Sequence, residues 1–390
     1  MSRILGVART LPFHSIGGMQ AIAWDLFCEF ARMGHEVTVV TTACPGRGSE
    51  FIEDGVRVLP LPNTRPERCD GRWWHASSKW FGTVGASGAD AVLSVSSAGA
   101  AMAARRSLAP CARFIFQAHG TSWGEFVSKW RSGRPIQWIK SARNLIWIFK
   151  DASIYRDFDR IVQVGDVLAN QFATAPMTLM AGRTPSLVIR NGIDERVFKP
   201  DPDARHRRRK ELGWGETDPV AVFAARMHPQ KGGEIAIRAF AAIASTLPGA
   251  RLLMVGGGVD LDRLRTLSAS MGMQESVSFT GSVARPIVAE LLAAGDAFVF
   301  PTLRQEGLPM NVLEALACGL RPVCASSTRD VFEATLPITY ADSRDVDAFA
   351  GRLRESLLLG ASGSSLLSPS YSLRECALRY LDVLGVGGAR

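Results

Sequence analysis

Short apolar runs alternate with helical segments through both halves of the chain. In the first half, Ile4–Val7 and Val37–Thr41 have the length and the β-branched content of buried strands, and Met19–Met33 between them has the length of a helix. In the second half, Val220–Ala224 and Arg251–Val255 repeat the strand pattern. Such alternation predicts parallel sheets with helices on both faces. The other strand candidates are Val56–Leu59, Ala91–Val95, Phe114–Gln117, Arg160–Val164, Leu187–Ile189, Val277–Thr280, Ala297–Phe300 and Pro322–Ala325.

Chain length and one turn signal divide this pattern into two domains. A chain of 390 residues is long enough for two domains of ordinary size, each with its own apolar core. The Asn-Gly pair at Asn191 is a strong turn signal, so we place a hinge at residues 191–200. We therefore predict an α/β protein with two Rossmann-like, doubly wound domains, at residues 1–190 and 201–370, that face a central cleft.

The whole net charge of the chain lies in its first half. Residues 1–190 hold 22 Lys and Arg against 14 Asp and Glu, whereas residues 191–390 hold 23 basic and 23 acidic residues. A basic half suggests an anionic partner surface. The sequence has no helix-turn-helix, zinc-finger or aromatic–basic sheet signature, which argues against nucleic acid. The basic run Arg205–Lys210 fits a nucleic-acid patch or, as we favour, a solvated helix.

One segment of the basic half combines tryptophans with basic residues. From residue 135 onward it has the pattern of an amphipathic helix. Trp with Lys and Arg suits the headgroup zone of an anionic membrane, where each basic residue contributes on the order of 1 kcal/mol. A core helix with a solvated basic edge explains the pattern equally well, and both interpretations stay open. The residues concerned are Trp138, Lys140, Arg143, Trp147 and Lys150.

Cysteine usage and hydropathy predict the compartment. The seven cysteines are odd in number and form no Cys-x-x-Cys pair, which is typical of reduced thiols. The first residues run directly into the strand candidate Ile4–Val7 without the apolar core of a signal peptide. No apolar run reaches the roughly 18 residues that span a bilayer. We expect a cytoplasmic protein, with peripheral contact at the inner face of the cell membrane as an option.

Two glutamates, Glu306 and Glu314, follow the strand candidate Ala297–Phe300. Pro309 suits the first helical position and Gly319 the helix end, so a helix begins between the two carboxylates. Glu306 then lies in a loop at the carboxyl end of a strand, the usual ligand edge of a parallel sheet. The helix dipole and the free N–H groups form an anion site. These groups belong to Gly307, Leu308, Met310 and Asn311. A nucleotide-sugar, with phosphate between hydroxyl groups, fits this arrangement.

Two cations follow another strand candidate. Arg226 and Lys231 lie in the loop after Val220–Ala224. Arg grips a diphosphate through two hydrogen bonds, and Lys adds a point charge that neutralises a leaving group. A basic surface loop is the alternative explanation.

Two motifs in the first half also follow strand candidates. Gly17 and Gly18 precede a helix, where glycines either let a ligand approach the backbone or form a tight turn. His119 follows Phe114–Gln117 and either donates to a ligand or makes a structural hydrogen bond.

The residues around the two glutamates resemble a known family. Glu306-Gly-Leu-Pro309 followed by Leu313-Glu-Ala-Leu-Ala-Cys-Gly319 resembles the Glu-x7-Glu segment of retaining glycosyltransferases of family 4, which have the two-domain GT-B fold. The resemblance implies an acceptor-binding first domain and a nucleotide-sugar-binding second domain. It also implies that residues 371–390 form a final helix that crosses back onto the first domain.

The resemblance assigns roles to the candidate residues. Arg226 and Lys231 match the family's Arg-x4-Lys diphosphate clamp, Glu314 takes the ribose hydroxyls, and Glu306 positions the sugar. His119 stands beside the sugar, and Gly120 occupies a place where the family often has an orienting Asp. The expected catalytic residues are His119, Glu306, Arg226 and Lys231. The expected donor-binding residues are Gly17, Gly18, Arg226, Lys231, Val283, Glu306, Gly307, Leu308, Pro309, Met310, Asn311 and Glu314.

The resemblance implies a retaining hexosyltransferase that uses a UDP- or GDP-sugar. The expected acceptor is a hydroxyl of a lipid-linked saccharide, in the synthesis of bacterial surface polysaccharide, lipopolysaccharide or glycolipid. Asp-x-Asp pairs at Asp157, Asp201 and Asp260 resemble a metal-binding motif of another transferase fold, but the two clamp cations make a metal unnecessary, so we predict metal-independent activity without a cofactor. The alternatives are a nucleotide-sugar epimerase of the same fold and a non-catalytic carbohydrate-binding protein.

Overall fold

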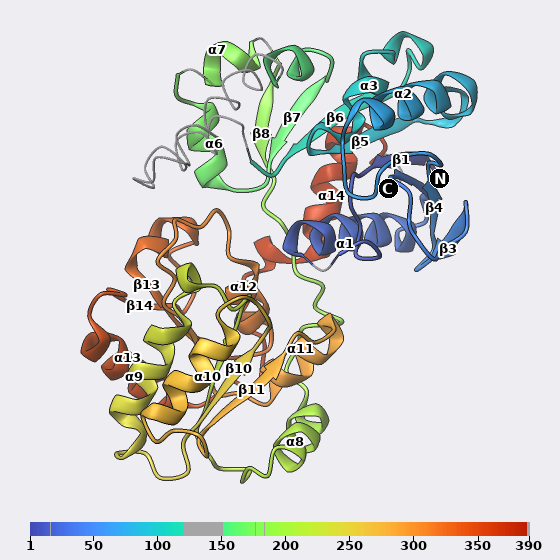
Figure 1. Cartoon of the computed structure of the whole chain (residues 1–390). Helices are drawn as coiled ribbons and strands as arrows, with labels where there is room; N and C mark the ends of the chain where they lie inside the picture. Colours follow the sequence, from blue (N-terminus) through green and yellow to red (C-terminus); the bar gives the residue numbers. More distant parts are fainter. Residues whose placement is uncertain (16, 121–150, 176, 183, 388–390) are drawn as a thin grey trace. The chain divides into compact units, whose positions relative to one another are not determined.

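The computed structural model describes the chain except residues 16, 121–150, 176, 183 and 388–390. The chain forms two compact units (Figure 1). The first unit combines Met1–Gly192 with Leu373–Arg390, and the second unit is Ile193–Ser372. The C-terminal segment therefore belongs to the same unit as the N-terminus. Within the described ranges, no helix has both the length and the apolar character needed to span a membrane.

The first unit is built on one eight-stranded sheet. Its strands are β1 (Arg3–Val7), β2 (Glu36–Thr41), β3 (Phe51–Glu53), β4 (Val56–Pro60), β5 (Ala91–Val95), β6 (Arg113–Ala118), β7 (Arg160–Gln163) and β8 (Ser186–Val188). They follow the order β3-β4-β2-β1-β5-β6-β7-β8, and all neighbours are parallel except β3 and β4. The strand series reverses direction across the sheet between β1 and β5, which is the doubly wound arrangement.

Helices cover both faces of this sheet. Those that the structure describes are α1 (Gly18–Arg32), α2 (Gly71–Trp80), α3 (Ala100–Ala103), α6 (Asp166–Phe172), α7 (Met177–Ala181) and α14 (Leu373–Leu384). Helices α1 and α14 pack against each other and share a core with Ile4, Leu93 and Ile115. The adjacent strand residues Leu5 and Phe114 belong to a second core with α2 and α3, because successive side chains of a strand point to opposite faces.

The second unit has six strands, all parallel. They are β9 (Val220–Ala224), β10 (Arg251–Val255), β11 (Val277–Gly281), β12 (Ala297–Phe300), β13 (Arg321–Ala325) and β14 (Thr339–Ala341). Their order is β11-β10-β9-β12-β13-β14, so the winding reverses between β9 and β12. The carboxyl ends of β9 and β12 meet at this switch point, where open α/β sheets bind ligands.

The helices of the second unit complete a second Rossmann-like fold. They are α8 (Pro202–Glu211), α9 (Gly233–Ala244), α10 (Leu261–Ser270), α11 (Arg285–Ala293), α12 (Met310–Ala317) and α13 (Val346–Leu359). Helices α9, α10 and α13 contribute to one core with the sheet, and α12 packs against β12 and β13. The predicted α/β fold with two doubly wound sheets is confirmed.

One edge of the first sheet departs from the predicted parallel pattern. Strands β3 and β4 form an antiparallel hairpin through Asp54 and Gly55, whose φ angles are 50° and 80°. A two-residue turn with positive φ at both positions matches the twist of the strands it joins, and Asp-Gly is a preferred pair for it. The Asp-Gly pair was therefore a usable signal for a hairpin.

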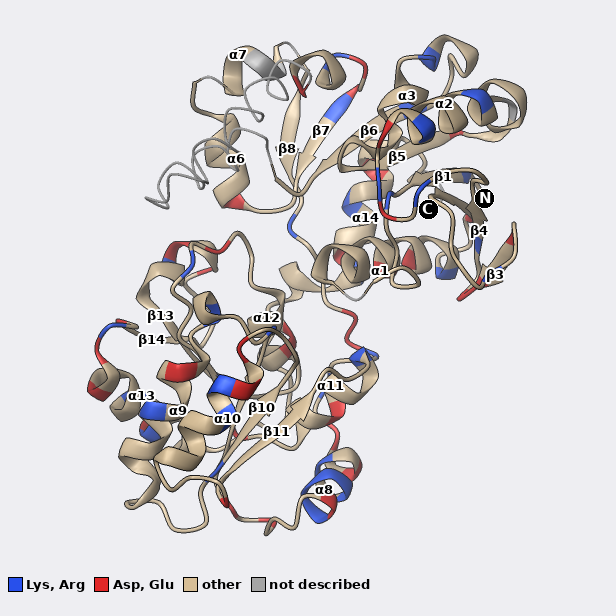
Figure 2. Ribbon diagram, viewed as in Figure 1, with Lys and Arg blue, Asp and Glu red and all other residues tan. Residues whose placement is uncertain are grey.

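The basic helix α8 also corrects an expectation. It carries the run of basic residues in Figure 2, yet it is not simply solvated. Arg209 is fully buried, bonds Asp296 at 2.8 Å and donates to four backbone carbonyls. Arg205 bonds the same Asp296 at 2.6 Å, and Arg208 pairs with Glu290 at 2.7 Å. These arginines attach α8 to α11 and to the start of β12, because their carboxylate partners lie there.

Candidate active site

Two loops meet beyond the carboxyl ends of β9 and β12. Lys231 lies at the end of the short turn Pro229–Lys231, and Glu306 lies in the loop before α12. The Lys231 Nζ donates to Glu306 Oε1 at 2.8 Å, and the Thr302 Oγ1 donates to the same oxygen at 2.8 Å. The two charged side chains are only 19% and 11% exposed. Within the described chain, Glu306 Oε2 has no hydrogen-bond partner, which leaves this oxygen for a ligand.

A glycine allows these loops to touch. Gly232 has a φ of +77°, and a Cβ at this position would lie 2.0 Å from the carbonyl oxygen of Pro301. Only glycine meets both conditions without strain. The N–H of Leu303 donates to the Gln230 carbonyl at 2.9 Å. The backbone therefore fixes the separation of Lys231 and Glu306.

A second glycine supports the loop that carries Arg226. Gly258, after β10, has a φ of +150°, and a Cβ there would lie 2.2 Å from the carbonyl oxygen of Met227. The N–H of Met227 donates to Gly257 at 2.8 Å. The loop after β10 is thus packed directly on the backbone beside Arg226.

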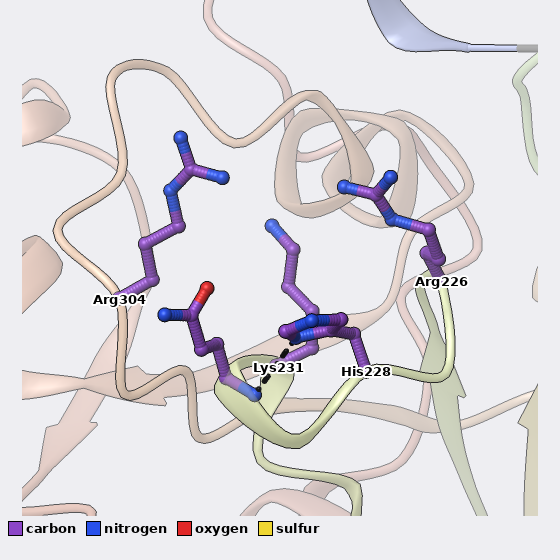
Figure 3. Close-up of a pocket in the computed structure, with 5 residues that line it drawn as sticks. Arg226, His228, Lys231 and Arg304 are labelled. Carbon is purple, nitrogen blue, oxygen red and sulfur yellow. Dashed lines mark hydrogen bonds between the residues drawn. The ribbon is translucent and has the colours of Figure 1, made fainter. Parts of the chain in front are cut away.

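Five side chains line a cavity of about 180 Å³ around Lys231 (Figure 3). In the figure, Arg226 and Arg304 lie on opposite sides, with Lys231 between them. Within the ranges that the structure describes, neither guanidinium makes an ion pair or a hydrogen bond. The lining residues are Arg226, His228, Gln230, Lys231 and Arg304. The cavity is therefore a concentration of positive charge suited to a phosphate-bearing ligand.

Helix α12 begins one residue later than the proline predicts. Pro309 takes the N-cap position, with an extended ψ of 100°, and Met310 is the first helical residue. Helix ends vary by a residue or two for the same local sequence. The predicted helix end is confirmed: Gly319 has a φ of +82° and donates to Leu316, while the next N–H, that of Leu320, donates to Ala315.

The start of α12 presents backbone donors. Four N–H groups make no hydrogen bond to any described residue: two lie in the first turn of the helix, where N–H groups have no intrahelical acceptor, and two lie in the loop before it. These N–H groups belong to Gly307, Leu308, Met310 and Asn311. The Asn311 side chain has a different task, because its Nδ2 donates to the Ala224 carbonyl at the end of β9 at 2.8 Å.

Glu314 lies further along α12 and already has a cationic partner. Arg285, at the start of α11, lies 3.3 Å from Glu314 Oε1, and its guanidinium stacks 4.9 Å from the ring centre of Phe198. Val283, predicted to bind the donor, precedes Arg285 by two residues. The Arg285 pair thus holds the Glu314 carboxylate.

His119 lies at the carboxyl end of β6 in the first unit. Its Nε2 is 2.9 Å from Oε1 of Gln117, and the Nε2 of Gln117 donates to the Tyr380 hydroxyl at 2.9 Å. Gln117 and Tyr380 are buried. Burial lowers the pKa of His119 from 6.5 to about 4, so its ring is neutral near pH 7. Gln117 therefore orients the His119 ring, which Gly120 cannot do because it has no side chain.

The glycine loop of the first unit leads into α1. Gly17 is the N-cap residue, with extended backbone, and its carbonyl accepts the first helical hydrogen bond from Ala21. A Cβ at Gly18 would meet no described atom within 4 Å, so the backbone there is open to a ligand.

One aspartate of each Asp-x-Asp pair makes a contact that stabilises the fold. Asp159 pairs with Arg106, and Asp201 caps α8 by accepting from Ala204. Asp260 pairs with Arg263 at 2.6 Å. Among the residues that the structure describes, no group of three or more His, Cys, Asp and Glu is arranged to hold a metal ion.

Some predicted residues lie outside the described ranges, and some site residues were not predicted. The residues outside the described ranges are the tryptophan and basic set Trp138, Lys140, Arg143, Trp147 and Lys150.

The site residues that were not predicted include Arg304 and Arg285. The position of Arg304 in the loop before Glu306 could have indicated that it belongs to the site. The unpredicted residues also include Gln117, whose partner Tyr380 is 263 residues away and left no local pattern.

Known proteins match both units. The family model described as "Glycosyl transferase 4-like domain" matches residues 17–192, and that described as "Glycosyl transferases group 1" matches residues 204–362. A solved sucrose-phosphate synthase from Thermosynechococcus elongatus superposes with a TM-score of 0.75 at 15% identity, covering 98% of each chain. This likeness identifies the fold as that of GT-B glycosyltransferases.

Curated relatives agree with these matches. The chain is 29% identical to the GDP-mannose-dependent alpha-(1-6)-phosphatidylinositol monomannoside mannosyltransferase of Mycobacterium tuberculosis, over 98% of each chain. It is 30% identical to the protein of the same name from Mycolicibacterium smegmatis, over 59% of this chain and 63% of that one. Together, the family models, the relatives and the two doubly wound units show that the chain belongs to glycosyltransferase family 4.

Proposed function

We propose that the protein transfers a hexose, with retention of configuration, from a nucleotide-diphosphate sugar to a hydroxyl of a lipid-linked acceptor. The observation that carries the proposal is the cavity of Arg226, Lys231 and Arg304 beside the Lys231–Glu306 pair. It combines cations for a diphosphate with a carboxylate oxygen for sugar hydroxyls. GDP-mannose is the first donor to test, because the mycobacterial relatives are named for it.

In this proposal the donor binds along the second unit. Arg226 and Lys231 hold the diphosphate, and the N–H groups at the start of α12 add donors to the phosphate or the sugar. Glu306 uses Oε1 to hold Lys231 and Oε2 to accept from a sugar hydroxyl. Glu314 accepts from the ribose hydroxyls, and backbone groups near Val283 contact the base.

The proposed reaction breaks the bond between the anomeric carbon and the diphosphate oxygen. The electron pair stays on that oxygen, and the cations stabilise the charge as it develops. The acceptor oxygen forms the new bond on the same face of the sugar, and its proton passes to the departing diphosphate. His119 and the loop at Gly17 and Gly18 contact the acceptor. His119, with its neutral ring, hydrogen-bonds to a sugar hydroxyl.

A transfer assay tests the proposal. The protein is incubated with GDP-mannose or UDP-glucose and phosphatidylinositol monomannoside in detergent, and the product is identified by mass spectrometry. Nuclear magnetic resonance of the new glycosidic bond reports its configuration. We expect an α-linked product whose formation Lys231→Ala slows strongly and the exposed control Lys210→Ala leaves unchanged. An inverted product contradicts retention, and sugar isomerisation without acceptor supports the epimerase instead.

We also propose that no metal is required, because Arg and Lys side chains supply the charge that a divalent ion supplies in other transferases. The test is the same transfer assay with a chelator. Unchanged activity agrees with the proposal, and activity lost on chelation and restored by manganese contradicts it.

The acceptor and the compartment belong to the same proposal. A cytoplasmic enzyme that meets its acceptor at the inner membrane face agrees with the excess of basic residues in residues 1–190. Sedimentation with vesicles that contain anionic lipid tests this, with Trp138, Trp147 and Lys150 replaced together as the comparison. Equal sedimentation of both proteins contradicts membrane contact through that segment.

A further inference from the structure

We infer that Arg304 is a third cation of the donor diphosphate site and makes this site selective for a diphosphate over a monophosphate. The inference rests on the proposed function. Arg304 lies in the loop after β12, and its side chain lines the same 180 Å³ cavity as Arg226 and Lys231. Figure 3 shows Arg304 on the side opposite Arg226, so a ligand between them meets positive charge from both loops.

The charges in the site indicate why a third cation is needed. Glu306 accepts from Lys231 at 2.8 Å, so its negative charge offsets that of the lysine. Arg226 would then be the only uncompensated cation of the expected clamp, whereas a nucleotide-sugar carries one negative charge on each phosphate. With Arg304, two uncompensated cations face the two negative charges of the diphosphate. None of the five residues that line the cavity is acidic.

Arg304, like Arg226 on the other side of the cavity, has no carboxylate partner among the described residues. In the same unit, Arg208 pairs with Glu290 and Arg263 pairs with Asp260. Among the described residues, the Arg304 guanidinium contacts no acidic group. The Arg304 side chain is exposed and has no acidic partner among the described residues, so an anion bound in the cavity would supply its counter-charge.

The backbone holds Arg304 in position. Its N–H donates to the Thr302 Oγ1 at 3.2 Å, and this hydroxyl also donates to Glu306. The neighbouring N–H of Leu303 donates to the Gln230 carbonyl at 2.9 Å. The Arg304 backbone is therefore held within its own loop, and the adjacent Leu303 bonds that loop to the loop of Gln230 and Lys231.

This placement has a consequence for the leaving group. When the bond to the sugar breaks, the terminal phosphate gains negative charge, and Arg304 contributes more to the products than to the intact donor. Interactions that strengthen as charge develops raise the rate of the chemical step. A nucleoside monophosphate lacks the terminal phosphate, so we expect Arg304 to contribute little to its binding.

Calorimetric titration tests the inference without an acceptor. Wild-type protein, Arg304→Gln, Arg304→Lys and the exposed control Arg354→Gln are titrated with GDP, GMP, UDP and UMP. For the diphosphate that wild type prefers, we expect Arg304→Gln to weaken binding by about tenfold, with less than a twofold effect on the matching monophosphate. Lysine retains the charge but not the planar fork, so Arg304→Lys should lie between the two.

The outcomes separate the inference from the proposed function. If wild type binds neither diphosphate, the proposed function fails and the inference fails with it. If wild type binds a diphosphate and Arg304→Gln leaves its affinity unchanged, only the inference is overturned. Equal losses for the diphosphate and the monophosphate overturn it as well. Unchanged thermal unfolding of each variant shows that the comparison is between folded proteins.

Discussion

Lys231 donates to Glu306 at 2.8 Å, so the residue assigned to the diphosphate and the residue assigned to the sugar form one ion pair. The pair joins the loop after β9 to the loop after β12, at the point where the winding of the sheet reverses. A change in either residue therefore alters the charge that the other presents to the donor. The predictions for these two residues follow from this coupling.

Lys231→Ala should lower turnover by about a hundred- to a thousandfold, because the leaving group loses a donor and the Glu306 carboxylate is left without its counter-charge. The double variant Lys231→Ala, Glu306→Gln should bind GDP more tightly than Lys231→Ala alone, since the repulsive carboxylate is gone. Calorimetry on the four proteins of the cycle measures the coupling, which we expect at about 0.5–3 kcal/mol. Strictly additive effects would show that the pair is not coupled.

The two glutamates should differ in what they bind. Glu314→Gln should weaken GDP and GMP equally, by about tenfold, because both contain the ribose. Glu306→Gln should slow turnover yet bind GDP at least as tightly as wild type, because Lys231 is then free of its carboxylate partner. Titration with both nucleotides, together with initial rates, checks the difference. Identical profiles for the two variants would contradict their separate roles.

Gly232→Ala should disrupt the site through the backbone. An added Cβ would lie 2.0 Å from the Pro301 carbonyl at a φ of +77°, so the loops of Lys231 and Glu306 must separate. We expect a cost of at least about 1–3 kcal/mol in the free energy of unfolding, together with loss of nucleotide binding. Gly351→Ala is the matched control: Gly351 is exposed in α13 with nothing within 4 Å, and alanine there should stabilise by about 0.5–1 kcal/mol. Thermal unfolding curves compare the two, and equal midpoints would exclude the close approach.

His119 should make stability depend on pH. Burial lowers its pKa from 6.5 to about 4, so between these values the unfolded chain takes up a proton that the folded protein does not. The stabilisation is complete above pH 6.5 and is lost as the pH falls toward 4. Wild type should therefore lose more stability than His119→Gln between about pH 7.5 and pH 4.5. His35, whose pKa is also lowered by burial, is present in both proteins and cancels. Parallel curves would contradict the lowered pKa of the partly buried His119.

The fold and the backbone features were predictable from the sequence because they depend on short segments. Strand β12 has the predicted bounds, Ala297–Phe300, because a run of four apolar residues before a loop has the length of a buried strand and is too short for a buried helix. The end of α12 at Gly319 was predictable for the same reason, because a left-handed residue at a helix end favours glycine.

Contacts between distant segments could not be predicted in this way. Gln117 meets Tyr380 across 263 residues, and nothing near His119 in the sequence indicates that a residue of α14 completes its hydrogen-bond chain. The basic helix α8 was misjudged because the Asp296 that binds Arg209 lies 87 residues away. Arg304 was missed although it stands near Glu306, since its role depends on the facing position of Arg226.

A crystal structure with the nucleoside diphosphate that binds in calorimetry tests the central claim most directly. The account predicts phosphate oxygens about 3 Å from the side-chain nitrogens of Arg226 and Lys231, at the start of α12, with the ribose beside Glu314. A nucleotide bound in the first unit, or bound with its phosphates away from these two cations, would contradict the account.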